Sequence, residues 1–245
     1  MNAAGQMWPA FFLLLALLIS ILASYIMFNF IGNLKRTNTT FRQFWLVGGA
    51  CVFGIGMWAK HFVTVLAHGM PLYFGWGIPI GLFFIVFFSL MAFVMLTFQG
   101  VFRYRLMAGS TILAFGIAFL NFLSLLMQPI AHLGWRPAFI ALSLAVLFAG
   151  NYLSFRFAES DRKGRLWFAS ATLGMSAVVA QMLSMRGLKI DYAGIYSSDK
   201  LNSDINLLAL IVAIGTLLIL LSTLVTWYID KRLNQMDERY RLLVE

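Results

Sequence analysis

The stretch LLALIVAIGTLLILLSTL, residues 207–224, decides what kind of protein this is. It contains 18 consecutive residues without a charged side chain, and most of them are aliphatic. About 20 apolar residues in an α-helix cross the ~30 Å hydrocarbon core of a bilayer, and runs of 18 or more indicate such a helix. The stretch therefore predicts a membrane-spanning helix, and it directs the search to similar runs elsewhere in the chain.

The composition of the whole chain supports a membrane protein. Of its 245 residues, 61% are hydrophobic and only 11% are charged, whereas a soluble domain averages about 25% charged residues. Such a chain has too few polar side chains to cover itself in water, so we expect the lipid bilayer to be its solvent. The single cysteine, Cys51, lies in an apolar run and excludes a disulfide framework within the chain.

Seven stretches are long and apolar enough to span a bilayer. They are residues 9–33, 44–67, 76–99, 107–128, 137–157, 166–186 and 206–229. Lipid offers no hydrogen-bond partner to the backbone, so each stretch should form a helix. We therefore predict an all-α, multi-pass membrane protein with seven transmembrane helices.

The basic residues predict how this bundle is oriented. Thirteen of the 18 lie after the first, third and fifth helices or in the C-terminal tail: Lys35, Arg36, Arg42, Arg103, Arg105, Arg156, Arg162, Lys163, Arg165, Lys231, Arg232, Arg239 and Arg241. Because cytoplasmic loops carry the excess of Lys and Arg, we expect the N-terminus outside and the C-terminus inside. The net charge of +9 then serves orientation, and we expect no nucleic-acid partner.

Three of the predicted helices share a pattern. Their segments read GIGMWAKHFVTVLA (54–67), FGIAFLNFLSLLM (115–127) and LGMSAVVAQMLSM (173–185). Aligned on Gly56, Gly116 and Gly174, each begins with small residues and then places a polar residue near the outer end. Since each of these helices follows a helix that ends in a basic inner loop, the repeating unit is a helix pair of 55–60 residues. We predict three such pairs followed by a final helix.

The polar residues of this pattern are the candidate ligand-binding site. Lys60, His61, Asn121 and Gln181 converge near the outer surface if the three repeats pack around one axis. Polar groups inside membrane helices are costly and mark functional sites by default. Two interpretations remain open from the residues alone: a pocket for an anionic or polar small ligand, and a structural network that holds the helices together.

The tail after the last helix has the pattern of a short coiled coil. Ile229, Leu233, Met236, Tyr240 and Leu243 are spaced 4, 3, 4 and 3 residues apart, which is a heptad seam. We therefore divide the chain into a membrane domain, residues 1–229, and a cytoplasmic signalling helix or linker, residues 230–245. The seam predicts a homodimer through this exit helix.

The chain also resembles the MHYT family of bacterial membrane sensor domains. The resemblance rests on three repeats and on the segments ASYIMFNFIGNLKR (23–36), GGACVFGIGMWAKHFVTVLA (48–67) and the final WYIDKRL. It implies a multi-pass sensor in the bacterial inner membrane, working in signal transduction. In the family, Met-His pairs are thought to bind copper and so to detect oxygen, carbon monoxide or nitric oxide.

This chain departs from the family at those pairs. They read Lys60-His61, Leu120-Asn121 and Ala180-Gln181, so one of three histidines remains. By resemblance, the candidate copper ligands are His61, Met57, Met127 and Met185. Amides are poor ligands for soft metals, and a Lys ammonium offers no lone pair to a cation.

The last nine residues, DERYRLLVE (237–245), resemble the start of a PAS domain. PAS domains often follow MHYT modules and precede diguanylate cyclase, phosphodiesterase or histidine kinase domains. We therefore expect the chain to be the membrane portion of a longer receptor, with an output of that kind, such as cyclic di-GMP signalling.

No pattern in the chain indicates catalysis. The predicted motif helices hold no paired carboxylates, and the chain has no Gly-rich phosphate loop. We expect this chain to be a sensory membrane domain, not an enzyme, which detects a ligand on the outer side and relays it through the final helix. The alternatives are a transporter or channel for small molecules or ions, and a structural dimerisation anchor.

Overall fold

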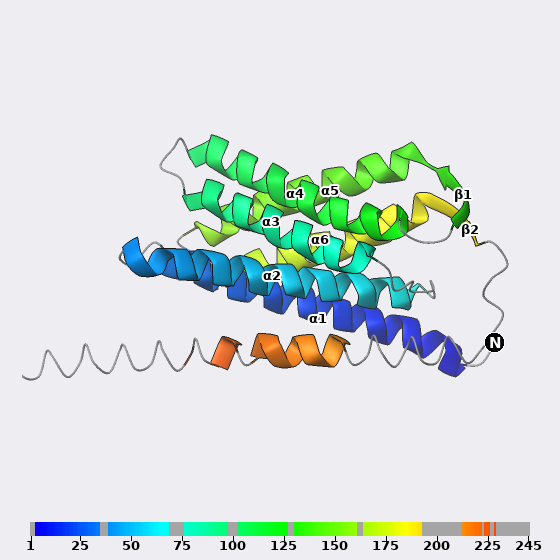
Figure 1. Ribbon diagram of the computed structural model, residues 1–245, viewed down its shortest axis with the longest axis horizontal. Helices are drawn as coiled ribbons and strands as arrows, with labels where there is room; N and C mark the ends of the chain where they lie inside the picture. Colours follow the sequence, from blue (N-terminus) through cyan, green and yellow to red (C-terminus); the bar gives the residue numbers. More distant parts are fainter. Residues whose placement is uncertain are drawn as a thin grey trace, which may run out of the picture.

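The computed structural model describes residues 3–34, 39–68, 76–97, 102–126, 130–160, 164–192, 212–221, 223–225 and 228. Its elements are the helices α1 (Ala3–Leu34), α2 (Thr39–Ala67), α3 (Gly77–Thr97), α4 (Phe102–Leu126), α5 (Pro137–Ala158) and α6 (Arg165–Arg186), with the strands β1 (Ile130–Trp135) and β2 (Leu188–Tyr192) (Figure 1).

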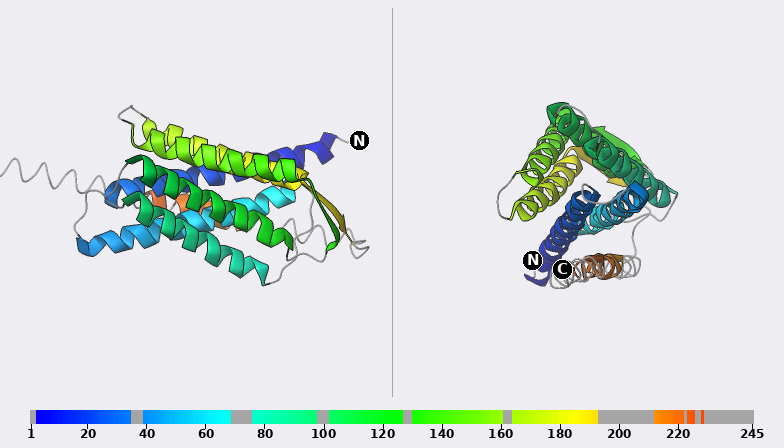
Figure 2. Two further views of the ribbon diagram at one scale, coloured as in Figure 1. Left: turned by 90° about the horizontal axis from the view of Figure 1, so that it is seen from above. Right: turned by 90° about the vertical axis from the view of Figure 1, so that its left-hand side faces the viewer.

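The six helices form a ring in the order of the chain. Each helix packs against the next one, and α6 returns to lie beside α1, as the end-on view in Figure 2 shows. The helices α2, α4 and α6 also touch one another across the centre, whereas the odd-numbered helices lie between them. The helices with the shared motif thus meet at one axis, which is the arrangement that places their polar residues together.

All six helices are long and apolar enough to cross a membrane. Their spans are Ala10–Gly32, Trp45–Ala67, Pro79–Thr97, Tyr104–Leu123, Pro137–Ala158 and Arg165–Arg186. Large apolar side chains such as Leu14, Phe83 and Phe168 are about two-thirds exposed on the outside of the ring, where lipid rather than water would cover them. The predicted helical membrane bundle is therefore confirmed.

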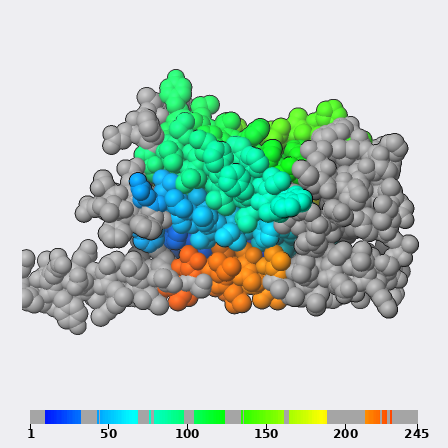
Figure 3. All heavy atoms as spheres, in the orientation of Figure 1, coloured from blue at the N-terminus to red at the C-terminus, as the bar shows by residue number. Residues whose placement is uncertain are grey.

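The predicted seventh helix is described only in part. Residues 212–221 and 223–225 are helical, and we call them the seventh segment. It lies outside the ring against α1 and α2, in orange in Figures 2 and 3, with Leu220 buried. The predicted signalling helix, residues 230–245, lies outside the described residues. The count of seven spans and the orientation of the bundle therefore stay predictions.

The third repeat aligns differently from the prediction based on Gly174. Asn121 follows His61 by 60 residues and Gln181 follows it by 120, and the same spacing matches Gly56 and Gly116 with Ser176. A side chain at Gly116 would collide with Phe88 of α3, 2.5 Å away. In the third pair the glycine at the close contact lies on the odd-numbered helix. Ser176 of α6 occupies the repeated position and packs directly on Gly150 of α5.

The alignment on Gly174 is therefore off by two residues. Gly174 faces a different neighbour, since a Cβ there would lie 2.8 Å from the Ser20 hydroxyl of α1. The sequence contained two small residues near this point, and only the packing shows which of them occupies the repeated position.

A two-stranded sheet departs from an all-α chain in the described residues. Strand β1 follows α4 and pairs antiparallel with β2, which follows α6, from Ile130 opposite Tyr192 to Trp135 opposite Leu188. The backbone N–H of Arg136 donates to the carbonyl of Gly187 over 2.8 Å. This bond joins the sheet to the start of α5 and the end of α6. The pairing joins segments more than 50 residues apart, so no local sequence pattern predicts it.

Candidate functional site

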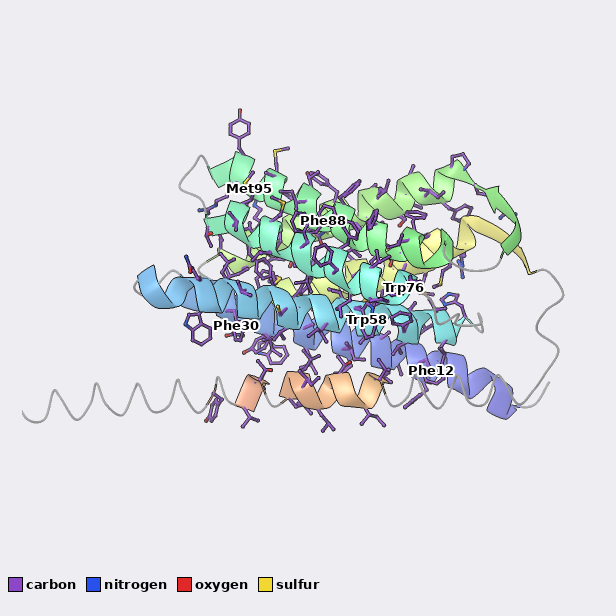
Figure 4. The ribbon with its side chains drawn as sticks, in the orientation of Figure 1. Phe12, Phe30, Trp58, Trp76, Phe88 and Met95 are labelled. Carbon is purple, nitrogen blue, oxygen red and sulfur yellow. The ribbon has the colours of Figure 1, made fainter. Side chains whose placement is uncertain are left out.

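The four predicted polar residues meet at the centre of the ring. Lys60 and His61 come from α2, Asn121 from α4 and Gln181 from α6, and each is at most 1% exposed. Figure 4 labels Trp58, which lies two residues before Lys60 on α2. The structure thus brings together all four residues from three different helices. We call these four residues the central network.

Lys60 joins α2 to α6. Its Nζ donates to Gln181 Oε1 over 2.8 Å and lies 3.4 Å from the backbone carbonyl of Ala177. Both acceptors are neutral groups. A side chain long enough to cross between helices is needed here, and the flexible Lys stem supplies it.

Gln181 links Lys60 to His61. Its Oε1 accepts from Lys60 while its Nε2 donates to the backbone carbonyl of His61 over 3.0 Å. The same Nε2 lies 3.0 Å from His61 Nδ1. Because an amide has one donor end and one acceptor end, contacts on both ends set its orientation. Gln181 is therefore the hub of the network.

His61 has two possible proton arrangements. Its Nδ1 lies 3.2 Å from Asn121 Oδ1 and 3.0 Å from Gln181 Nε2. In one arrangement Nδ1–H donates to Asn121 Oδ1. In the other, the proton is on Nε2 and Nδ1 accepts from Gln181 Nε2.

Sequence reasoning missed the hydroxyl groups about one turn farther toward the C-terminal ends of α2 and α6. Thr64 Oγ1 donates to the Lys60 carbonyl over 2.9 Å. The hydroxyls of Ser143 and Ser184 lie 2.7 Å apart, and each bonds the carbonyl of Ala180. The signal was available, because Thr64, Ser124 and Ser184 each follow a network residue by three positions.

The candidate copper ligands do not share one level of the bundle. Met57 and Met185 are buried, whereas Met127 lies outside the described residues. The even-numbered helices run in the same direction, and His61 and Gln181 are at one height because they bond each other. Met57 precedes His61 by one turn and Met185 follows Gln181 by one turn. Their Cα atoms are therefore about 6 Å to either side of the network.

Side-chain direction widens this separation for Met57. Long side chains on a helix usually point toward its N-terminus, so we expect Met57 to point away from the network and Met185 to point toward it. Among the residues that the structure describes, no three His, Cys, Asp or Glu side chains group around a possible metal. The donor set thus does not fit a copper ion held by all the candidate ligands, and copper binding stays a prediction.

Comparisons with known proteins give two relatives. The chain is 27% identical over 231 residues to the bifunctional diguanylate cyclase/cyclic di-GMP phosphodiesterase MucR of Pseudomonas aeruginosa, covering 89% of this chain and 33% of MucR. It is 24% identical over 151 residues to the signaling protein YkoW of Bacillus subtilis, covering 58% of this chain and 18% of YkoW. No family model and no solved structure matches.

These comparisons concern only part of each relative. The chain spans a third or less of the length of the curated relatives that it matches. The resemblance to the MHYT family therefore stays a resemblance. The six membrane-length helices and the similarity to two signalling proteins together point to a membrane signalling domain.

Proposed function

We propose that this chain is the sensory membrane domain of a bacterial signalling protein, with the central network as its input site. The observation that carries the proposal is the network itself. In an apolar bundle, hydrogen bonds join three helices through residues 60 and 120 positions apart. Buried polar groups in membrane helices are costly and are functional candidates for that reason.

The site suits detection because one residue holds several contacts. A ligand that takes one of the bonds of Gln181 must also disturb Lys60 or His61, since the same amide binds both. Ligand binding then changes hydrogen bonds on α2 and α6 at the same time. A signal of this kind needs two states that differ in contacts at the site and at the output.

The relay we propose runs through Gly56. This residue lies five positions before His61 on α2 and packs directly on Ala23 of α1. A Cβ at Gly56 would also lie 3.9 Å from Leu220 Cδ2 of the seventh segment. With no side chain to absorb a displacement, a movement of α2 at this level would be passed directly to α1, and Leu220 of the seventh segment lies next to this contact.

The output we propose is cytoplasmic and lies beyond the seventh segment. MucR bears the name of a cyclic di-GMP enzyme, and its similarity to this chain covers a third of its length. We infer that the bundle controls a cytoplasmic partner domain of the PAS, diguanylate cyclase, phosphodiesterase or kinase type. A homodimer through the exit helix would allow the seventh segments of two copies to transmit the signal together.

The competing function is a structural anchor, which the burial and the bonding of the network also favour. Interhelical hydrogen bonds in membranes contribute about 0.6–2 kcal/mol each. The two functions differ in what happens at a distance. In an anchor, loss of a network bond lowers stability and leaves the seventh segment in place. In a sensor, the same loss also moves the seventh segment.

This difference is measurable with spin labels on the full chain in nanodiscs. In a Cys51→Ala background, labels at Leu218 and Phe168, both exposed, report the distance between the seventh segment and α6. We expect Gln181→Leu to shift or broaden this distance distribution. The matched control is Val179→Leu, a lipid-facing change two residues away on the same helix. An unchanged distribution in a folded Gln181→Leu protein would assign the network to an anchor.

A further inference from the structure

Lys60 is the one basic residue that lies deep in the six helices. The others lie within three residues of a helix end: Arg42, Arg103, Arg105, Arg156, Arg165 and Arg186. Lys60 lies seven residues before the end of α2, which is about 10 Å from the C-terminal end of that helix. Its side chain is fully buried, so it does not extend to the membrane surface.

No helix of the ring carries an acidic residue to pair with it. The nine acidic residues all lie outside α1–α6: Glu159, Asp161, Asp191, Asp199, Asp204, Asp230, Asp237, Glu238 and Glu245. Glu159 pairs with Arg105 over 2.7 Å at the opposite end of α4 from the network. A charge inside a membrane protein is normally paired, and within the described part of the chain Lys60 donates to the neutral oxygens of Gln181 and Ala177.

We propose that Lys60 is the binding site for a small monovalent anion that enters from the outer side. This inference rests on the proposed function and names its ligand class. A buried ammonium is strongly unfavourable without a counter-ion, so a bound anion would stabilise the charged form of Lys60. An ammonium has three N–H donors, and two have acceptors in the described residues. The anion accepts from the third donor or replaces Gln181 Oε1.

The size and the charge of the ligand follow from the surroundings. The network residues are at most 1% exposed, so the occupant is an ion of few atoms. A metal cation would lie beside the Lys60 ammonium and be repelled by it, and two of the three motif histidines are replaced by amides. The amides that fit copper poorly are suitable donors to an anion.

Binding at Lys60 also explains how the ligand would alter the bundle. The bond from Nζ to Gln181 Oε1 links α2 to α6. An anion that takes the place of Oε1 breaks this link and frees the Gln181 amide to reorient. The contact of Nε2 with His61 Nδ1 then changes, and His61 adopts its other proton arrangement.

The test uses the full chain, purified in chloride-free gluconate buffer. Sodium chloride or sodium formate is added at constant ionic strength, and the thermal unfolding midpoint and the tryptophan fluorescence are followed. We expect a saturable response for the small anions and none for added gluconate. Lys60→Met should weaken the apparent affinity by at least about tenfold, while Lys60→Arg keeps a response. The control is Arg186→Met, an exposed basic residue at a helix end.

Two results would overturn the proposal. One is an equal anion response in wild type and folded Lys60→Met protein, or no response in either. The other is stoichiometric copper that survives desalting and disappears in His61→Ala, measured by elemental mass spectrometry. Neither result decides the sensory role, because the spin-label distances test the network without any ligand. A shifted seventh segment in Gln181→Leu with no anion response would retain the sensor and reject the anion.

Discussion

At the scale of the residue, Gln181 determines how the central network holds together. Its amide accepts from Lys60 and donates to the His61 carbonyl, so it orients the two adjacent residues of α2. The structure gives Lys60 no charged partner on any of the six helices. Substitutions at these two positions should therefore depend strongly on each other.

We expect Gln181→Leu to lower the free energy of unfolding by about 2–4 kcal/mol, because it leaves the buried Lys60 with one distant acceptor. In Lys60→Met/Gln181→Leu the loss should be smaller than the sum of the two single losses by about 1–3 kcal/mol. Denaturant unfolding of the four proteins in detergent measures this coupling. Strict additivity would show that the bond between Nζ and Oε1 contributes nothing.

At the scale of the element, small residues set how closely the helices of each pair approach. The first two repeats lack a side chain on α2 and α4, at Gly56 and Gly116, whereas the third lacks it on α5, at Gly150. In each of the three pairs a glycine lets the two helices approach closely, although in the third pair it lies on the other helix. Close approach of this kind supplies the van der Waals contact that holds membrane helices together.

Gly116→Ala should destabilise the protein by about 1–3 kcal/mol, because the new Cβ would lie 2.5 Å from Phe88 Cβ. The matched control is Gly32→Ala, since a Cβ at Gly32 meets nothing within 4 Å. That substitution should be neutral or should stabilise α1 by up to about 1 kcal/mol. Thermal unfolding of both variants measures the contrast. Equal effects would mean that helix propensity, not packing, governs Gly116.

At the scale of the whole molecule, the sheet of β1 and β2 lies at one end of the ring of three helix pairs, on the right in Figure 1. The distribution of Lys and Arg predicts that this end faces outward and that the loop between α5 and α6 faces the cytoplasm. Entry of an anion from outside requires this orientation, because Lys60 is nearer the end of the bundle that carries the sheet.

Cysteine labelling tests the orientation in intact cells. In a Cys51→Ala background, Gly134→Cys on β1 and Arg165→Cys at the start of α6 both place a thiol at an exposed position. A membrane-impermeant maleimide should label Gly134→Cys from outside and should label Arg165→Cys only after the cells are opened. The reverse labelling pattern would show that the orientation is opposite to the predicted one. The end of the bundle nearer Lys60 would then face the cytoplasm.

The sequence by itself determined the membrane class, the helical bundle and the residues of the central network. These follow from local properties, since an apolar run must satisfy its own backbone in lipid, and a polar residue within such a run stands out. Only the tertiary structure showed that Gln181 bridges Lys60 and His61, that Met57 and Met185 lie on opposite sides of the network, and that Ser176 rather than Gly174 occupies the repeated position. These features depend on the height and rotation of each helix relative to its neighbours. A shift of one residue rotates a helical side chain by about 100°, and only the packing of the whole ring selects among such arrangements.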